Sequence, residues 1–264
     1  MDDKFFIDNL FSGIFFPRKT PIPEENKSLF RILRVKVDNE TQIGGILYLH
    51  SNPTDYPTVI FFHGNGETAL DYNYFVKSYI DCGVNFAMFD YRGYGFSSGI
   101  PKYTALFEDP LIIYDQFSKW IESEYSGIMA STFFVMGRSL GSACAACLGG
   151  YNPEKMKGII FESGFGSNKR MIQLISSRYP NISPEILKPY SNDTYTSQIK
   201  KPCLVIHGRR DQIIPFVEGE YLFSSIPSNI EKKFIEIRSA THNDISSYES
   251  EYYPPIKKFI EKYK

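Results

Sequence analysis

Short runs of apolar, β-branched and aromatic residues recur along the chain, and helix-like segments separate most of them. Eight runs have the length and composition of strands: Phe30–Val37, Gly45–His50, Thr58–His63, Asn85–Asp90, Thr132–Gly137, Lys157–Ser163, Cys203–Gly208 and Lys233–Arg238. Helical patterns occupy most of the gaps from the third run onward: Glu67–Ile80, Asp109–Tyr125, Leu140–Gly149, Phe216–Ile226 and Ile245–Tyr263. In the last of these, Pro254 and Pro255 are expected to break or restart the helix.

The central runs are apolar at nearly every position, as in TVIFF, FFVM, GIIF and CLVI. Strands that are buried on both faces have this composition, which is typical of a parallel sheet covered by helices. The first two runs are joined by a short polar segment around Asn39–Gln42, so they are predicted to form an antiparallel hairpin. The pattern therefore predicts an α/β fold: one mostly parallel, eight-stranded sheet with helices on both faces, in a single domain over residues 1–264.

One gap between strands differs from the others. Residues 166–202 are rich in Ser, Pro, Asn and Tyr and show no strand pattern. Long excursions from a compact domain are usually functional, so we expect a short cap insertion here. Its apolar positions follow a helical spacing, at Met171, Ile172, Leu174 and Ile175. One such helix would form one wall of an open groove and could not enclose a large cavity.

Composition and charge exclude several classes of protein. The 264 residues carry a formal net charge of -1 and no run rich in Lys or Arg, so a nucleic-acid partner is not expected. No apolar stretch reaches the ~18 residues of a membrane-spanning helix. Four cysteines are too few for a disulfide framework, which favours a reducing, cytoplasmic location.

The N-terminal aromatic residues have two interpretations. They could contact a membrane interface or cover part of the core, and they are Phe5, Phe6, Phe11, Phe15 and Phe16. Lys4 is the only basic residue before Arg18. Because membrane-surface helices are rich in basic residues, packing against the core is the favoured interpretation.

The most specific chemical motif is Gly137-Arg138-Ser139-Leu140-Gly141. It lies between an apolar strand run and a helix-forming run of small residues, which is the context of a G-x-S-x-G nucleophile elbow. A serine on so sharp a turn is strained, and larger side chains two residues away would clash, which explains both glycines. Ser139 is therefore the candidate nucleophile.

A serine nucleophile needs a base, and the base needs an orienting carboxylate. The chain has four histidines, and only His242 lies in a loop after the final strand, so His242 is the candidate base. Asp211 follows the strand Cys203–Gly208 and is the candidate acid, in the chain order Ser, acid, His. Asp244 and Glu162 are the rival carboxylates.

An oxyanion would require two backbone amides. One is expected from Leu140, which follows the nucleophile, and the other from Asn65, in the turn His63-Gly64-Asn65-Gly66-Glu67 after the third strand. The spacing Gly64-x-Gly66-x-x-Ala69 also resembles a dinucleotide fingerprint, but it would leave the serine, aspartate and histidine unexplained. Cys144 and Cys147 have redox-like spacing, but they are expected in the buried helix that follows Ser139, where packing of small apolar residues is the favoured explanation.

Together these motifs resemble those of the α/β-hydrolase superfamily. The resemblance runs from Leu29 to Lys264 and rests on HGNGE, DYRGYGFSSG, GRSLG, ESGFGS, HGRRDQIIP and THND. Within the superfamily the chain looks like the serine aminopeptidase-like hydrolases of the S33 type, nearest the Bem46-like, depalmitoylase-like branch. The resemblance implies the Asn65 oxyanion amide and a structural role for Asp90.

The expected function is that of a serine hydrolase that cleaves acyl esters or thioesters through an acyl-enzyme, without metal or cofactor. Its substrate would be a small molecule or an acylated protein. A serine aminopeptidase-like peptidase and a non-catalytic binding protein of the same fold are the alternatives. The cysteine-rich N-terminus of eukaryotic depalmitoylases is absent from this sequence, and 37 residues are few for the helical cap of true aminopeptidases.

Overall fold

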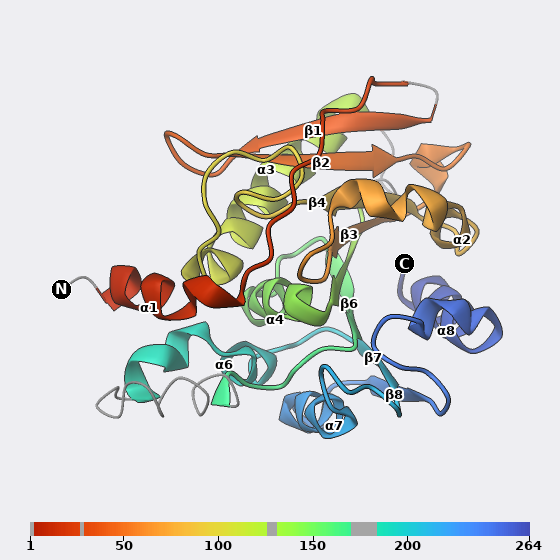
Figure 1. The fold of residues 1–264 in the computed structure, drawn as a ribbon. Helices are drawn as coiled ribbons and strands as arrows, with labels where there is room; N and C mark the ends of the chain where they lie inside the picture. The colour runs from red at the N-terminus through yellow and green to blue at the C-terminus, as the bar shows by residue number, and fades with distance from the viewer. Residues whose placement is uncertain (1–2, 27–28, 126–130, 170–183) are drawn as a thin grey trace.

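A computed structural model describes residues 3–26, 29–125, 131–169 and 184–264. Its centre is one eight-stranded sheet with the strand order β1-β2-β4-β3-β5-β6-β7-β8 (Figure 1). β2 runs antiparallel to both of its neighbours, and the other pairs are parallel. The strands are β1 (Phe30–Lys36), β2 (Gln42–Tyr48), β3 (Thr58–Phe62), β4 (Asn85–Phe89), β5 (Phe133–Arg138), β6 (Met156–Glu162), β7 (Cys203–Gly208) and β8 (Lys232–Ile237).

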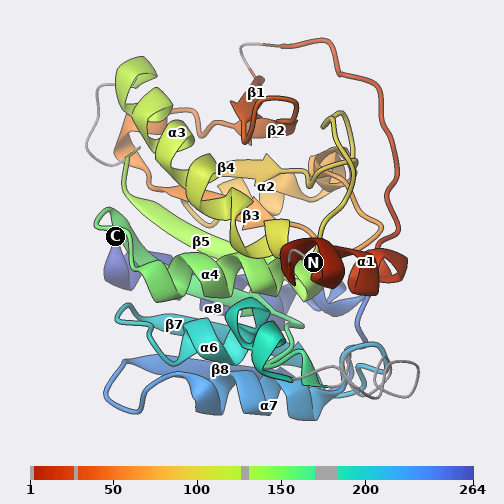
Figure 2. The same ribbon diagram turned by 90° about the vertical axis from the view of Figure 1, so that its left-hand side faces the viewer.

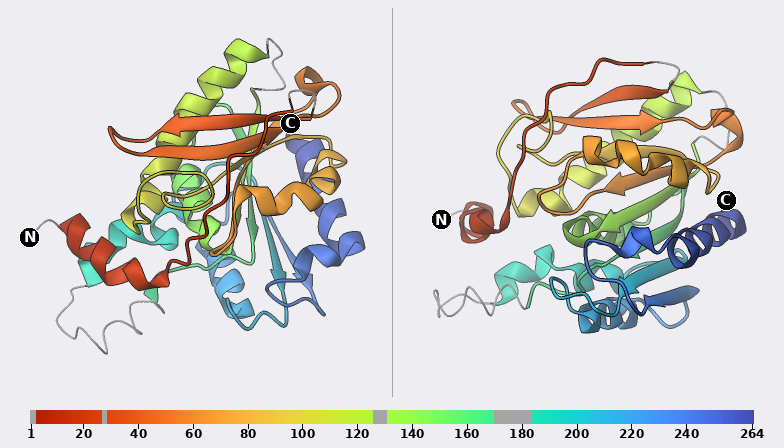
Figure 3. Two further views of the ribbon diagram at one scale, coloured as in Figure 1. Left: turned by 45° about the horizontal axis from the view of Figure 1, so that its top comes forward. Right: turned by 45° about the vertical axis from the view of Figure 1, so that its right-hand side comes forward.

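Helices cover both faces of the sheet. The first face is covered by α3 (Asp109–Glu124), α4 (Ser142–Tyr151) and α7 (Phe216–Ser225) (Figure 2). The second is covered by α2 (Val76–Ile80) and α8 (Glu249–Tyr263) (Figure 3). The remaining described helices are α1 (Asp3–Phe11), α6 (Asn192–Thr196) and the 3₁₀ helices η1 (Ser12–Ile14), η2 (Pro53–Asp55), η3 (Ala69–Tyr74), η4 (Thr104–Phe107), η5 (Ser139–Gly141), η6 (Pro184–Tyr190) and η7 (Ile245–Ser247).

Strand β3 shows why the central runs are apolar throughout. Ile60 and Phe62 pack into the core on the α4 face, whereas Val59 and Phe61 pack into the core on the α8 face. A strand that is buried on both sides is apolar at nearly every position, and its few polar side chains lie near its ends, such as Thr58. The predicted mostly parallel, eight-stranded α/β sheet is confirmed, as is the antiparallel hairpin of its first two strands.

Two helix predictions were wrong in detail. Pro254 and Pro255 were expected to interrupt the last helix, but α8 continues through both. Each proline removes one backbone hydrogen bond, and the buried residues on either side, Tyr252 and Ile256, keep the helix in place by packing on the sheet. The segment expected as one helix over Glu67–Ile80 is divided into η3 and α2, and η3 begins after a capping box at Thr68.

The segment between β6 and β7 is described in part. Within it, η6 and α6 lie at the same end of the molecule as α1 (Figure 1). Asn192 in α6 donates to the Phe165 carbonyl at 2.7 Å and to Ser142 Oγ at 3.1 Å, which joins α6 to the start of α4. The helix predicted around Met171–Ile175 lies outside the described residues, and the single domain with its cap stays a prediction. Among the described residues, no helix is long and apolar enough to span a membrane.

Candidate active site

The turn between β5 and α4 holds Ser139 in a left-handed conformation, with φ of 50°. The two glycines of the motif are required by close backbone contacts. A Cβ on Gly137 would lie 2.2 Å from the Gly141 carbonyl oxygen, and one on Gly141 would lie 2.1 Å from the Phe62 carbonyl oxygen. The second contact packs the turn onto the end of β3. The serine is therefore strained in place beside the loop that follows β3.

The side chains of Ser139, His242 and Asp211 form a hydrogen-bonded chain. His242 Nε2 lies 3.0 Å from Ser139 Oγ, and His242 Nδ1 lies 2.7 Å from Asp211 Oδ2. All three residues are buried. Ser139 follows β5, Asp211 follows β7 and His242 follows β8, so three loops at one edge of the sheet bring together residues that are far apart in the sequence.

The Asp211 carboxylate is held rigidly. Its Oδ1 accepts hydrogen bonds from the amides of Ile213 and Ile214, at 2.9 and 2.8 Å. Burial opposes its ionisation, but hydrogen bonds from His207 and His242 outweigh burial and hold the pKa of Asp211 well below its usual value. The residue is thus ionised at neutral pH beside His242, which is what a positioning acid requires.

The structure places the two rival carboxylates elsewhere. Asp244 Oδ1 accepts a hydrogen bond from the Thr241 amide at 2.6 Å and so stabilises the histidine loop locally. Glu162 is buried, and it accepts from the Tyr252 hydroxyl at 2.6 Å. Burial raises the pKa of Glu162, although the nearby Arg138 cation partly offsets this rise.

The loop after β3 contains Asn65. Gly64 donates its amide to Glu67 Oε2 at 2.7 Å, which fixes the turn, and Gly66 has φ of 78°. Leu140 lies in the first turn of η5, where backbone amides have no acceptor within the helix. Because Gly141 packs on the end of β3, the Leu140 and Asn65 amides belong to adjoining turns.

Arg138 links the nucleophile turn to the histidine loop and to the Asn65 loop, a role that the sequence motifs did not predict. This buried guanidinium donates to the His242 carbonyl at 3.0 Å. It also forms ion pairs with Glu67 and Glu162, each at 3.3 Å. One cation thus joins the nucleophile turn, the histidine loop and the Asn65 loop. A charged residue directly before the serine, at the end of an apolar strand, was the one sign of this role in the sequence. Its partners Glu67 and Glu162 are 71 and 24 residues away, and no local pattern connects them to Arg138.

Two other patterns have structural explanations. Asp90 directly follows β4, about 20 residues after the glycines that resemble a dinucleotide fingerprint. It accepts a hydrogen bond from the Ala69 amide at 2.9 Å and lies 3.3 Å from His63 Nε2. It therefore ties the Asn65 loop to the end of β4. Cys144 and Cys147 lie in α4, and both are free and buried. Cys82 and Cys203, elsewhere in the chain, are also free and buried. Burial raises the pKa of Cys144 and of Cys147, so neither thiol is poised to react.

The fold and the site together define a serine hydrolase with the α/β-hydrolase fold. The chain belongs to the family described as serine aminopeptidase, S33, whose sequence model matches residues 55–193. This confirms the family expected from the motifs.

Similar proteins agree with this assignment. The chain is 28% identical over 225 residues to alpha/beta hydrolase domain-containing protein 17C of mouse and of human, which covers 82% of this chain. It spans 63% of the mouse relative and 61% of the human one.

Three solved structures share the fold. An esterase from Pyrococcus furiosus has a TM-score of 0.71 at 17% identity, and the match covers 94% of this chain and 97% of the esterase chain. Est1E from Butyrivibrio proteoclasticus, solved with ferulic acid bound, has a TM-score of 0.68 at 16% identity and covers 88% and 98%. The acylaminoacyl peptidase of Pyrococcus horikoshii has a TM-score of 0.64 at 16% identity and covers 89% and 41%.

Proposed function

We propose that this protein hydrolyses acyl esters or thioesters through an acyl-enzyme formed on Ser139. The observation that carries the proposal is the continuous chain of hydrogen bonds from Ser139 through His242 to Asp211, at 3.0 and 2.7 Å. Acyl transfer needs a serine that is linked to a base, and a base whose other nitrogen is bound to a carboxylate. These three side chains provide that arrangement.

In the first half of the reaction, Ser139 Oγ attacks the acyl carbonyl carbon while His242 Nε2 takes the hydroxyl proton. Asp211 keeps the remaining proton of His242 on Nδ1 and stabilises the cation that forms. The oxyanion is bound by the amides of Asn65 and Leu140. As the intermediate collapses, His242 gives its proton to the departing alcohol or thiol, and the acyl group stays on Ser139.

In the second half, water replaces the leaving group. His242 Nε2 removes a proton from the water, whose oxygen attacks the acyl carbon and generates a second oxyanion at the same amides. Collapse of this intermediate returns the proton to Ser139 Oγ and releases the carboxylic acid. Each proton transfer passes through His242 Nε2, which lies 3.0 Å from Ser139 Oγ.

The acyl group is expected to lie in an apolar groove. Support comes from the N-terminal segment, which carries the exposed ring of Phe16 beside the Asn65 loop. Each methylene that such a groove covers contributes about 0.8 kcal/mol. We therefore expect kcat/KM to rise over the first few carbons of the acyl chain and then to level off. A small-molecule ester and an acylated protein would both present such a chain.

Labelling with a fluorophosphonate tests the nucleophile. The wild type should be labelled, and Ser139→Ala should not be. Ser123→Ala serves as a matched control, because Ser123 lies exposed near the end of α3 and donates only to the Trp120 carbonyl in the same helix. Equal labelling of Ser139→Ala and wild type would refute the proposal. A folded wild type that is neither labelled nor active on p-nitrophenyl esters would favour a non-catalytic binding protein.

The acyl-chain series separates esterase from peptidase activity. Hydrolysis of p-nitrophenyl acetate, butyrate and hexanoate should increase in that order, and cleavage of alanine p-nitroanilide should be slow. Rapid cleavage of the anilide would move the assignment to a peptidase, whereas a clear preference for acetate would contradict the apolar groove. The cytoplasmic location expected from the cysteine content stays a prediction.

A further inference from the structure

Residues 7–18 are held firmly against the rest of the protein. Ile7, Phe11 and Phe15 are buried in the core, and the Phe11 ring stacks on Tyr103 with 4.0 Å between ring centroids. Asp8 accepts a hydrogen bond from the Thr104 amide at 2.9 Å. This segment is an ordered part of the molecule, and it precedes the residues that the family sequence model matches.

The same segment grips the side chain of Asn65. The amide of Phe16 donates to Asn65 Oδ1 at 3.0 Å, and Asn65 Nδ2 donates to the Ile14 carbonyl at 2.6 Å. The buried hydroxyl of Tyr94 also donates to Asn65 Oδ1, at 2.6 Å. Arg18 Nε donates to the Gly66 carbonyl at 3.4 Å and forms an ion pair with Asp71. The loop that carries the proposed oxyanion donor is therefore braced by the chain that precedes the sheet.

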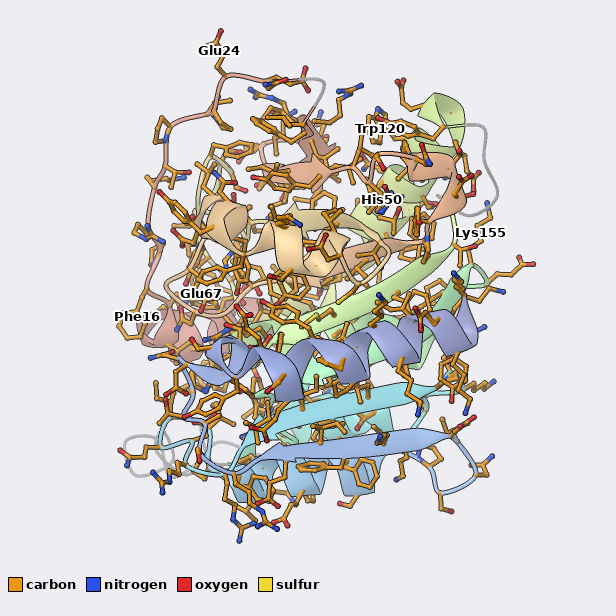
Figure 4. All side chains as sticks on the ribbon, turned by 90° about the vertical axis from the view of Figure 1, so that its right-hand side faces the viewer. Phe16, Glu24, His50, Glu67, Trp120 and Lys155 are labelled. Carbon is orange, nitrogen blue, oxygen red and sulfur yellow. The ribbon has the colours of Figure 1, made fainter. Side chains whose placement is uncertain are left out.

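Phe16 differs from the aromatic residues around it. Its side chain is 67% exposed, whereas Phe11 and Phe15 are buried. Its backbone amide is held by Asn65, and its Cβ lies 3.8 Å from the position that a Cβ on Gly66 would occupy. Figure 4 shows Phe16 and Glu67 at the same edge of the molecule. An exposed ring on a fixed backbone, next to the Asn65 loop, is suited to cover an apolar substrate group.

From these contacts we infer that residues 14–18 are a built part of the active site, in two ways. Their backbone fixes the Asn65 side chain and so positions the oxyanion amide, and the Phe16 ring is a specificity-determining contact for the acyl chain. This inference rests on the proposed acyl transfer. Phe16 is the specificity residue, and the Phe16 amide and the Ile14 carbonyl are positioning groups.

Phe16→Ala tests the ring, with Phe5→Ala as its control. Phe5 is a comparably exposed phenylalanine, at 62%, on the first helix. Both changes retain the backbone amide. Phe16→Ala should lower kcat/KM for p-nitrophenyl hexanoate roughly tenfold and leave acetate within about twofold, because only the longer chain reaches the ring. Phe5→Ala should leave the whole series unchanged. Equal losses on acetate and hexanoate, or equal effects of the two variants, would overturn the ring assignment.

Phe16→Pro tests the backbone brace. It removes the same ring as Phe16→Ala and, in addition, the amide that donates to Asn65. Phe15 has φ of −83° and ψ of 137°, the extended conformation that a following proline requires. On acetate, Phe16→Pro should lower kcat roughly tenfold below Phe16→Ala with KM unchanged, because a displaced oxyanion donor weakens binding of the transition state alone. Equal kcat values for the two variants would refute the brace.

These outcomes remain separate from failure of the proposed function itself. If wild type is not labelled at Ser139, the proposed acyl transfer fails before any Phe16 variant is measured. If wild type is labelled and active, the Phe16 variants test this inference alone. Thermal melts should place Phe16→Ala and Phe16→Pro within a few degrees of wild type, because Ile7, Phe11 and Phe15 still anchor the segment. Should Phe16→Pro unfold, Asn65→Ala removes that hydrogen bond from the loop side, together with those to Tyr94 and to the Ile14 carbonyl, and should show a selective loss in kcat at least as large.

Discussion

Asp211→Asn should nearly abolish activity while the shape of the site is retained. In the wild type, Asp211 Oδ1 accepts from two backbone amides, at 2.9 and 2.8 Å, and Oδ2 faces His242 Nδ1. An asparagine would place its carbonyl oxygen on those amides, so its NH₂ group would point at His242. The histidine would then accept at Nδ1 and carry its proton on Nε2, where it cannot take the proton of Ser139.

The size of the loss follows from the two amide bonds. Turning the asparagine to restore the active tautomer would set NH₂ against two partly buried N–H donors. Each donor left without an acceptor costs about 1–3 kcal/mol. The productive orientation is therefore disfavoured by roughly 2–6 kcal/mol, which corresponds to a loss of roughly 30-fold to 10⁴-fold. A reduction in kcat of about 10⁴ falls within this range.

The assay is steady-state hydrolysis of p-nitrophenyl hexanoate at pH 7.5, with Asp244→Asn as the matched control. Asp244 lies in the same loop as His242, and its Oδ1 accepts only the local Thr241 amide, a bond that an asparagine oxygen can also accept. This control should keep activity within a few-fold of wild type. An Asp211→Asn enzyme with more than a tenth of wild-type kcat would refute the reasoning. An inactive Asp244→Asn beside an active Asp211→Asn would reverse the assignment of the acid.

Two further substitutions and the pH dependence of stability also test the site. Gly137→Ala sets a Cβ against the Gly141 carbonyl oxygen, so fluorophosphonate labelling should slow at least tenfold and the melting temperature should fall; unchanged labelling would contradict the elbow geometry. Arg138→Met leaves Glu162 without its cation and should cost about 3–5 kcal/mol in urea unfolding, part of which Glu162→Gln should restore. Because the pKa of folded Asp211 is lowered, its ionisation stabilises the fold above pH ~4, and this stabilisation is lost as the pH falls. Wild type should therefore lose more stability than Asp211→Asn below pH ~5, and parallel acid-unfolding curves would exclude this contribution.

Much of the fold could be predicted because the sheet imposes its requirements locally. A strand that is buried on both faces is apolar at nearly every position, and the sharp turn at Ser139 must have glycines where backbone atoms approach closely. The order of Ser139, Asp211 and His242 along the chain, each after a strand, placed them at one edge of a parallel sheet. The structure has these side chains within hydrogen-bond distance.

Other features depend on contacts between distant parts of the chain. The course of α8 through two prolines is decided by packing of Tyr252 and Ile256 on the sheet, which outweighs the local preference of proline. The partners of Arg138 come from the Asn65 loop, from the end of β6 and from the histidine loop, so the position of Arg138 next to Ser139 did not reveal its role.

The aromatic N-terminus was expected to cover the core, and this holds for Phe11 and Phe15. It does not hold for Phe5 or for Phe16, which are 62% and 67% exposed. Helix α1 ends at Phe11 and η1 at Ile14, and Phe15 is extended, so the side chains of Phe15 and Phe16 point to opposite sides of the chain.

Because all four cysteines are buried, the folded protein can be assayed with thiol-specific reagents without a background from its own thiols. Burial raises the pKa of Cys82 to about 11 and raises the pKa of Cys144, Cys147 and Cys203 as well. At pH 8 these thiols are mostly protonated, whereas the thiolate is the form that attacks disulfide reagents. The folded protein should therefore contribute almost no colour to an Ellman assay, in which a released thiol reports thioester cleavage in real time. On unfolding, the same four thiols become reactive. The reagent that reports turnover by the native protein therefore also reports the fraction of unfolded molecules.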